Sequence, residues 1–140
     1  MTVAPSNHNA EIIEEFRANA GIVGGRYAGR PVILVHHQGR KSGLERINPL
    51  TCQPLENGWA VFASYGGAPH HPDWFLNLLA HPVTSVEFGT ETAEVTVRVA
   101  EGEEREALWR RQKHLAPIFA EYEVKAGERQ IPVVVLERVR

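Results

Sequence analysis

Hydrophobic and polar positions alternate over short distances in much of this chain, a pattern that predicts β-strands. In the clearest case Val95, Val97 and Val99 alternate with polar residues, which indicates one buried and one solvent-facing side. Turn signals such as Asn57-Gly58 and Gly89-Thr90 separate the apolar segments. The strands predicted in this way cover residues 31–37, 46–53, 59–64, 83–88, 93–99 and 131–137.

Other segments repeat their apolar residues with the period of a helix. Residues 11–20 carry three large apolar side chains on one face, which predicts a short amphipathic helix. A second helix is predicted from Pro72, a favoured first helical residue, to His81. A third helical pattern opens with the acidic residues 101–106 and meets Pro117, which forces a kink or a restart.

This order of elements favours an α+β fold. Six strands of meander type with helices between them, and no repeated strand-helix-strand unit, favour an antiparallel barrel over a doubly wound sheet. The length of 140 residues suits a single domain, which we expect over residues 11–140 after a flexible N-terminus of residues 1–10. No segment approaches the roughly 20 apolar residues that span a bilayer, and we see no secretion signal.

Composition and charge narrow the possible ligands. With 43% hydrophobic and 23% charged residues the chain is typical of globular proteins. The single cysteine, Cys52, excludes an internal disulfide framework and fits a reducing cytoplasm. The net charge of −2 argues against a general nucleic-acid binder. Residues 24–46 nevertheless hold five cations against one acid, so we interpret this basic patch as a site for a small anionic ligand.

The basic patch centres on the predicted turn Gly39-Arg40-Lys41-Ser42-Gly43. A guanidinium, an ammonium and a hydroxyl between two glycines are donors that suit a phosphate group. A tight hairpin turn with exposed charge is the plain alternative. A nucleotide-binding P-loop is disfavoured, because that motif needs a helix after its Lys-Ser pair and a strand follows here. His36, just before the turn, is a further candidate for lining the bound ligand.

Other catalytic chemistries find little support. Seven histidines invite a metal site, but His36 and His37 are neighbours in a strand and point to opposite faces. His70-His71 has no acids at ligand spacing, so we expect no metal. There is no serine nucleophile elbow, and Cys52 has no evident activating partner. The chemistry is therefore expected to come from an organic cofactor.

Two further features are suited to a planar cofactor. The run Ser64-Tyr65-Gly66-Gly67 ends a strand with a hydroxyl, a ring and two glycines against which a ring system can lie, although an ordinary loop exit is the alternative. Trp74 and Asn77 are three residues apart on a predicted helix, so they share a face with a stacking plane and an amide donor. Tyr122 and Phe119 are candidates to cover the pocket.

Taken together and in their order along the chain, the motifs closely resemble those of the deazaflavin-dependent nitroreductase and quinone reductase family. The resemblance covers roughly residues 11–138. The resemblance is carried by Gly39-Arg40-Lys41-Ser42-Gly43, Arg46-x-Asn48-Pro49-Leu50, Ser64-Tyr65-Gly66-Gly67, Pro72-x-Trp74-x-x-Asn77-Leu78, His81-Pro82 and Ile131-Pro132-Val133-Val134-Val135. It implies a split β-barrel related to flavin-binding oxidoreductases. It also implies an enzyme that uses the reduced deazaflavin coenzyme F-420 to reduce quinones or nitro compounds.

The resemblance further implies residue roles. The phosphodiester and acidic tail of the coenzyme would be held by Arg40, Lys41, Ser42, Gly43 and Arg46. The deazaflavin ring would be lined by Asn48, Pro49, Leu50, Ala63, Ser64, Tyr65, Gly66, Gly67, Trp74 and Asn77. Hydroxyl donors to the reduced acceptor would be Ser64, Tyr65 and Tyr122. Some relatives have Lys where Tyr65 stands and tyrosines near Ala116 and Phe119, which leaves substrate choice and proton donor open.

Several alternatives stay open at this point. One alternative is a non-catalytic protein that carries the coenzyme, and another is a barrel that binds FMN or haem in its place. The implied partner is a quinone or nitroaromatic acceptor. A homodimer is an open alternative, and so is contact of the N-terminal helix with a membrane surface, although that helix has only Arg17 as a cation.

Overall fold

The structure, a computed structural model, describes residues 7–139. The flexible N-terminus expected over residues 1–10 lies outside the described residues as far as residue 6, and from Asn7 the chain is helical. The helices are α1 (Asn7–Ala18), α2 (Asp73–Ala80), α3 (Gly102–Leu115) and α4 (Ile118–Ala126), with single 3-10 turns η1 (Gly25–Tyr27) and η2 (Tyr65–Gly67). The strands are β1 (Val32–Gln38), β2 (Glu45–Leu55), β3 (Gly58–Phe62), β4 (Val83–Phe88), β5 (Glu91–Val99) and β6 (Val133–Arg138).

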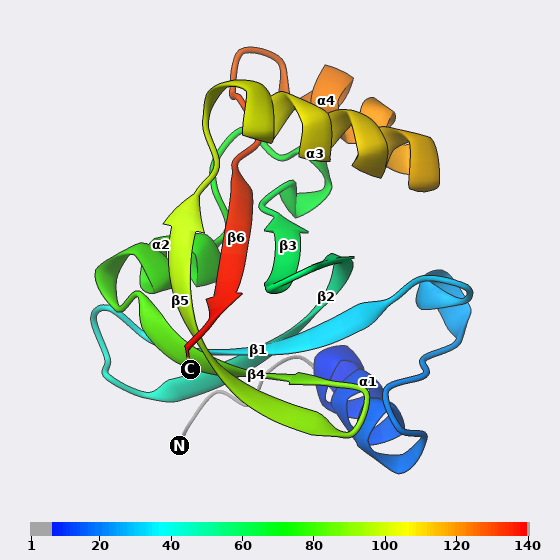
Figure 1. Cartoon of the computed structure of the whole chain (residues 1–140), viewed down its shortest axis with the longest axis vertical. Helices are drawn as coiled ribbons and strands as arrows, with labels where there is room; N and C mark the ends of the chain where they lie inside the picture. The colour runs from blue at the N-terminus through cyan, green and yellow to red at the C-terminus, as the bar shows by residue number, and fades with distance from the viewer. Residues whose placement is uncertain (1–6, 140) are drawn as a thin grey trace.

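The six strands close into a barrel in the order β1-β2-β3-β6-β5-β4, with every neighbouring pair antiparallel (Figure 1). The last strand, β6, pairs with β3 and β5, and β4 closes the barrel against β1. The expected α+β split-barrel fold is therefore confirmed. In the β1–β2 hairpin Gln38 lies opposite Glu45, so the basic turn at residues 39–43 connects the two strands at the rim of the barrel.

Strand β1 shows how the alternation of side chains builds the site. Val35 belongs to the cluster inside the barrel, whereas Leu34 packs with Phe16 of α1 on the opposite face. Both faces of the strand are covered, which explains its continuous apolar run. Burial of a side chain such as Leu34 stabilises the fold by roughly 1.5–3 kcal/mol. The same alternation places His37 on the inner face of the strand and His36 on the outer face.

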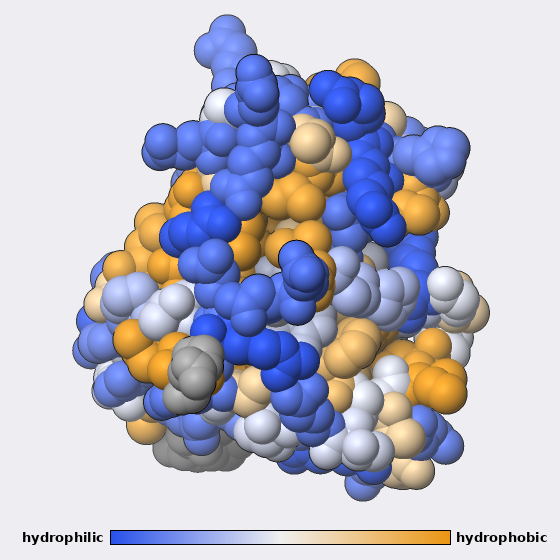
Figure 2. All heavy atoms as spheres, viewed as in Figure 1, coloured by the Kyte–Doolittle hydropathy of each residue, from blue (hydrophilic) through white to orange (hydrophobic). Residues whose placement is uncertain are grey.

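Helices close the barrel from two directions. Helix α2 places Trp74, Phe75 and Leu78 in the interior cluster. Helices α3 and α4 lie near each other at the top of Figure 1, and hydrophilic residues cover this region in Figure 2. Their rings Trp109 and Phe119 each lie 5.9 Å from the ring of Phe62 on β3. These contacts fix the position of α4 relative to the end of β3.

Two helix boundaries differ from the sequence prediction. Pro72 is the residue before α2 rather than its first residue, because its ψ of 153° is extended. Helix α1 begins four residues before the predicted start at residue 11 and ends at Ala18, after which Ala20 adopts a left-handed φ of 55° that stops the helix. The break at Pro117 is a restart, since α3 ends at Leu115 and α4 begins at Ile118.

Candidate functional site

A cleft of about 480 Å³ opens where β2 and the end of β3 meet α2, α4 and the connector after α1. Residues 48–51 of β2 form one wall, and Trp74 and Tyr122 come from α2 and α4. A second hollow, of about 860 Å³, lies at the start of α3. Among the described residues, that hollow has no aromatic side chain and none of the predicted site residues in its lining. We therefore place the candidate site in the smaller cleft.

A chain of hydrogen bonds runs from the basic turn to the wall of the cleft. Asn77 Oδ1 accepts from the backbone N–H and from Nη1 of Arg40, at 3.0 and 2.8 Å. Its Nδ2 therefore donates to His37 Nδ1, at 3.0 Å. The remaining ring nitrogen, Nε2, must carry the proton and donates to Asn48 Oδ1, at 2.8 Å. Burial lowers the pKa of His37, and this keeps its ring neutral within the chain of hydrogen bonds.

The basic turn has the compact shape expected of a hairpin connection. The Gly43 N–H donates to the Gly39 carbonyl at 2.9 Å, and the Leu44 N–H donates to Ser42 Oγ at 3.1 Å. Gly43 has a φ of +74°, in the left-handed region that favours glycine. A Cβ on Gly39 would lie 2.4 Å from Ser42 Oγ and 3.7 Å from Arg46 Nε. The Arg46 side chain therefore lies against the turn.

The cations of this turn lie beside the cleft rather than in its lining. Arg40 Nη2 pairs with Asp73 Oδ1 at 3.3 Å, and Asp73 lines the cleft at the start of α2. Lys41 is exposed. Arg40 is thus fixed by Asn77 and Asp73, whereas Lys41 makes no ion pair within the described residues. The predicted tail-binding residues Arg40, Lys41, Ser42, Gly43 and Arg46 are brought together, at one side of the cleft.

The loop after β3 has unusual backbone geometry. Tyr65, Gly66 and Gly67 have φ angles of 50°, 62° and 84°. Such a φ is strained for tyrosine and persists only where surrounding contacts impose it. A Cβ on Gly67 would lie 2.8 Å from the Tyr122 carbonyl oxygen, so the loop packs directly on α4. A Cβ on Gly66 would meet nothing within 4 Å, which leaves an open backbone surface in the cleft.

Arg129, which sequence reasoning missed, holds this loop in place. Its guanidinium donates to the carbonyl oxygens of Ala63, Ser64 and Ala68 at 3.1, 2.7 and 2.9 Å. It also contacts His71 Nδ1 at 2.9 Å. One side chain therefore fixes both ends of the strained turn. Because the guanidinium carries five N–H donors in a rigid plane, one arginine can bind several carbonyls at once.

All three tyrosines of the chain line the cleft. Tyr65 is half exposed, Tyr122 packs edge to face on Phe119 with centroids 5.3 Å apart, and Tyr27 is buried. Burial raises the pKa of Tyr27, so its hydroxyl stays protonated at neutral pH. The predicted candidates Tyr65 and Tyr122 are thus joined by Tyr27 from the N-terminal connector, a residue that sequence reasoning did not select.

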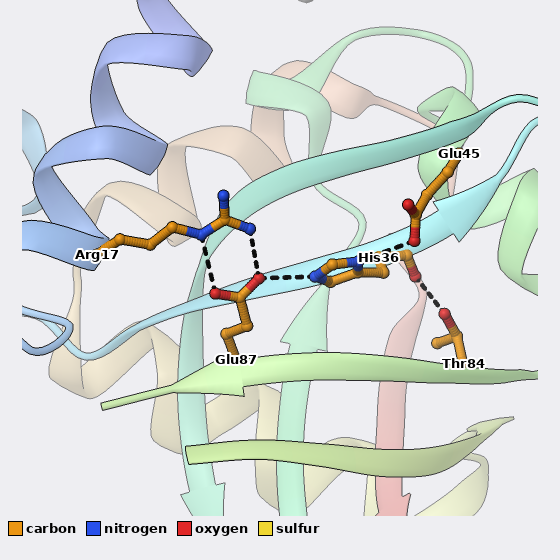
Figure 3. A network of polar contacts seen from close by, with 5 residues as sticks. All are labelled: Arg17, His36, Glu45, Thr84 and Glu87. Carbon is orange, nitrogen blue, oxygen red and sulfur yellow. Dashed lines mark hydrogen bonds and ion pairs between the residues drawn. The ribbon is translucent and has the colours of Figure 1, made fainter. Parts of the chain in front are cut away.

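His36 does not line the cleft, contrary to our expectation. Figure 3 shows its ring between two carboxylates on the outer face of β1, with Nδ1 3.0 Å from Glu45 Oε2 and Nε2 2.7 Å from Glu87 Oε2. Glu87 also accepts two hydrogen bonds from Arg17 of α1, at 3.0 and 2.7 Å. The alternation of side chains along β1 explains the difference, because it is His37 that points to the cleft.

Replacing Glu87 by glutamine is expected to lower the free energy of unfolding by about 1 kcal/mol near neutral pH. The hydrogen bonds from Arg17 hold the pKa of Glu87 below its ordinary value of 4.5. The carboxylate therefore stabilises the fold fully above that ordinary value, and its contribution is lost as the pH falls through the lower folded-state value. Urea unfolding of wild type and variant near pH 7 and near pH 3 measures the effect.

Glu45→Gln is the matched control, because Glu45 contacts the other nitrogen of His36 but not Arg17. We expect a smaller change from it. A stability difference for Glu87→Gln that is the same at both pH values would contradict the assignment to a carboxylate ion pair.

The remaining predicted residues divide into those in the lining and those behind it. The lining includes Asn48, Pro49, Leu50, Ser64, Tyr65, Gly66, Trp74 and Tyr122. Ala63, Gly67 and Asn77 lie behind it and position the residues that do line it. Lining residues that were not among the predicted site residues include His37, Tyr27, Thr51, Arg26 and Arg30. A signal for His37 was present, since a strand that buries Ile33 and Val35 inward also turns residue 37 inward.

Two other kinds of feature are absent from residues 7–139. No group of three or more metal-binding side chains comes together in this part of the chain. None of its helices is long and apolar enough to cross a membrane.

Comparisons with known proteins agree with the fold. The family model described as F420H(2)-dependent quinone reductase matches residues 9–138. An F420H(2)-dependent quinone reductase of Mycobacterium tuberculosis is 31% identical over 127 residues, which are 88% of this chain and 85% of that protein.

Two solved structures are similar as well. An F420-H2 dependent reductase has a TM-score of 0.70 and 39% identity, covering 81% of this chain and all of that one. A chain described as a domain-swapped dimer has a TM-score of 0.71 and 37% identity, covering 94% of this chain and 96% of that one. The protein therefore belongs to the F420H(2)-dependent quinone reductase family and is an oxidoreductase whose coenzyme is F420.

Proposed function

We propose that this enzyme reduces a planar quinone or nitroaromatic acceptor that lies in the cleft against the ring of coenzyme F420. The observation that carries the proposal is the juxtaposition of an open glycine backbone, the Trp74 ring and three tyrosines around one cleft. A planar acceptor needs flat apolar surfaces on which to stack, and its reduction needs hydroxyl donors close by. The cleft supplies both.

The residues present fit the coenzyme in two respects. The donors of the basic turn are two cations and a hydroxyl beside Arg46, the chemistry that a phosphodiester with an acidic tail requires. The open backbone at Gly66 leaves room for a ring system that a side chain would occupy. We therefore assign Arg40, Lys41, Ser42, Gly43 and Arg46 to the tail. Residues 48–50 and 64–66 and Trp74 are assigned to the ring.

When bound, the reduced deazaflavin supplies a hydride and the accompanying proton, two electrons in all, which convert a quinone to a hydroquinone. The residues of the protein position the acceptor and polarise its oxygen. Tyr65, Tyr122 and Ser64 are the hydroxyls that donate hydrogen bonds to the acceptor oxygen as negative charge develops on it. Asn48, whose Oδ1 is occupied by His37, keeps its amide N–H groups for a ligand. The strained backbone at Tyr65 is held ready by Arg129 before any ligand binds.

The proposal is tested by mixing the protein with reduced F420 and menadione and following reoxidation of the coenzyme. We expect reoxidation well above a protein-free control. No reoxidation across several quinones and nitroaromatics would contradict the proposed acceptor class. Tight coenzyme binding without any turnover would select the carrier alternative instead.

Tyr122→Phe is expected to lower kcat by about tenfold to hundredfold while leaving coenzyme affinity within about twofold. The ring packing on Phe119 is retained, and only the hydroxyl is lost. Steady-state kinetics with menadione, together with a fluorescence titration of oxidised F420, separate the two quantities. An unchanged kcat in Tyr122→Phe, with a large loss in Tyr65→Phe, would transfer the donor role to Tyr65.

A further inference from the structure

The N-terminal connector brings two arginines into the cleft beside a buried tyrosine. The turn η1 ends at Tyr27, whose side chain packs in the cluster with Val32 and Leu34 of β1. The Cζ atom of Arg26 lies 5.3 Å from the centre of the Tyr27 ring. Arg30 follows three residues later, is half-buried, and also lines the cleft. The buried tyrosine thus anchors both cations at this end of the cleft.

These two guanidinium groups have no carboxylate partner within residues 7–139. Five other arginines of the described chain are paired with carboxylates, namely Arg17, Arg40, Arg98, Arg105 and Arg138. Arg46, Arg110, Arg111 and Arg129 also lack a carboxylate partner within residues 7–139, but none of these four lines the cleft. Asp73 is the only acidic residue among the described lining residues, and it pairs with Arg40. Both connector cations act on the Tyr27 hydroxyl, where their charge opposes the rise that burial causes in its pKa. This end of the cleft therefore carries positive charge that no acidic side chain of residues 7–139 balances.

The connector cations and the basic turn lie at opposite ends of β1. Arg30 precedes the strand, whereas residues 39–43 follow it. Seven residues at about 3.3 Å each give β1 a length of roughly 20 Å. The cleft extends along this hairpin from His37 and Asn48 to Thr51 and Arg30. A coenzyme whose tail is held at the turn leaves Arg26 and Arg30 at the far end, beyond the ring.

We propose that Arg26 and Arg30 bind an anionic group, of the carboxylate type, on the acceptor. This inference rests on the proposed function and narrows it, since the acceptor becomes a planar quinone or nitro compound that carries a negative charge at one edge. A planar guanidinium pairs with a carboxylate through two parallel hydrogen bonds, and two such groups give both attraction and orientation. Tyr27, which lies close enough to both arginines to interact with their charge, adds a neutral hydroxyl at the same end of the cleft.

The test uses a naphthoquinone with a short side chain that ends in a carboxylate, and its methyl ester as a neutral analogue of nearly the same shape. Calorimetric titration into the protein saturated with oxidised F420 measures binding without turnover. Wild type is expected to bind the acid at least about tenfold more tightly than the ester. The double variant Arg26→Gln with Arg30→Gln is expected to bind both equally, with coenzyme affinity unchanged within about twofold.

Two control variants separate a specific effect of the connector arginines from a general effect of positive charge. Arg110→Gln with Arg111→Gln removes the same charge from the exposed face of α3 and is expected to keep the preference for the acid. Arg30→Lys, which keeps the charge and loses the planar donor pair, is expected to keep part of it.

Equal binding of acid and ester by wild type would overturn the inference. Loss of coenzyme affinity in the connector variant, without loss of discrimination, would also overturn it and assign these cations to the coenzyme tail. Absence of turnover of both quinones with reduced F420, combined with a clear preference for the acid in binding, would contradict the proposed function and leave standing only the anion-binding role of Arg26 and Arg30.

Discussion

Replacing Arg40 and Lys41 together by alanine is expected to weaken F420 binding by about a hundredfold or more. Each side chain is assigned a charge-assisted contact with the phosphodiester or acidic tail, and each such contact contributes roughly 1–3 kcal/mol. The two residues differ in their contacts with the rest of the protein. Lys41 is exposed and makes no ion pair within the described residues, whereas Arg40 also contacts Asn77 and Asp73. Titration followed by deazaflavin fluorescence measures the affinity of each single and double variant.

The single variants allow a sharper test of this assignment. Lys41→Ala is expected to weaken binding without changing stability, because its ammonium has no partner to lose within residues 7–139. Arg40→Ala is expected to weaken binding and also to lower the free energy of unfolding by about 1 kcal/mol through the lost bond to Asn77. Arg110→Ala with Arg111→Ala, two adjacent exposed cations of α3, is the matched control. Unchanged affinity in both turn variants would refute the assignment of this turn to the tail.

Arg129→Met is expected to lower the free energy of unfolding by about 2–4 kcal/mol and to weaken F420 binding at the same time. Methionine has a similar length but no donor, so the carbonyls of Ala63, Ser64 and Ala68 lose their guanidinium partner. The left-handed φ of Tyr65 costs of order 1–3 kcal/mol and persists only while these contacts impose it. Chemical denaturation and the same fluorescence titration measure both quantities.

Loss of stability alone does not establish that Arg129 positions the loop, so a destabilised control is needed. Leu136→Ala removes a fully buried side chain of the barrel interior and is expected to cost a comparable 2–5 kcal/mol. Because Leu136 lies away from the loop, its variant should keep coenzyme affinity within about twofold. Arg129→Lys should recover part of the affinity through its single ammonium. If Arg129→Met and Leu136→Ala lose coenzyme affinity equally, Arg129 contributes to stability only and does not position the loop for the coenzyme.

The strands were predictable because each is either an alternating or a continuous apolar run with turn signals nearby in the sequence. The segment β4 was predicted with its observed bounds, and β1 was shifted by one residue. Helix ends were less accurate, as the start of α1 at Asn7 shows, because a helix continues until a residue such as Ala20 takes a non-helical φ. The resemblance to the family supplied most of the candidate site, since its motifs lie in short runs of consecutive residues.

Residues missed by the sequence reasoning share a different property. Arg129 is 65 residues from Ser64, whose carbonyl it binds, and no local motif announces that contact. Tyr27 and Arg30 lie in a glycine-rich connector that reads as a flexible link, yet Tyr27 is buried in the cluster under α1. His36 and His37 both precede the same turn, and the alternation from Ile33 and Val35 already favours His37 as the inward residue, which the closed barrel confirms.

Local physical chemistry was therefore sufficient for the strands and the basic turn, because each depends on neighbouring residues and their allowed backbone angles. Closure of the barrel decided everything that joins distant segments. Pairing of β3 with β6 brings Arg129 to the end of β3, and packing of α1 on β1 brings the connector arginines to the cleft. These placements depend on the burial of apolar faces from the whole chain, a global property that no short run of sequence contains.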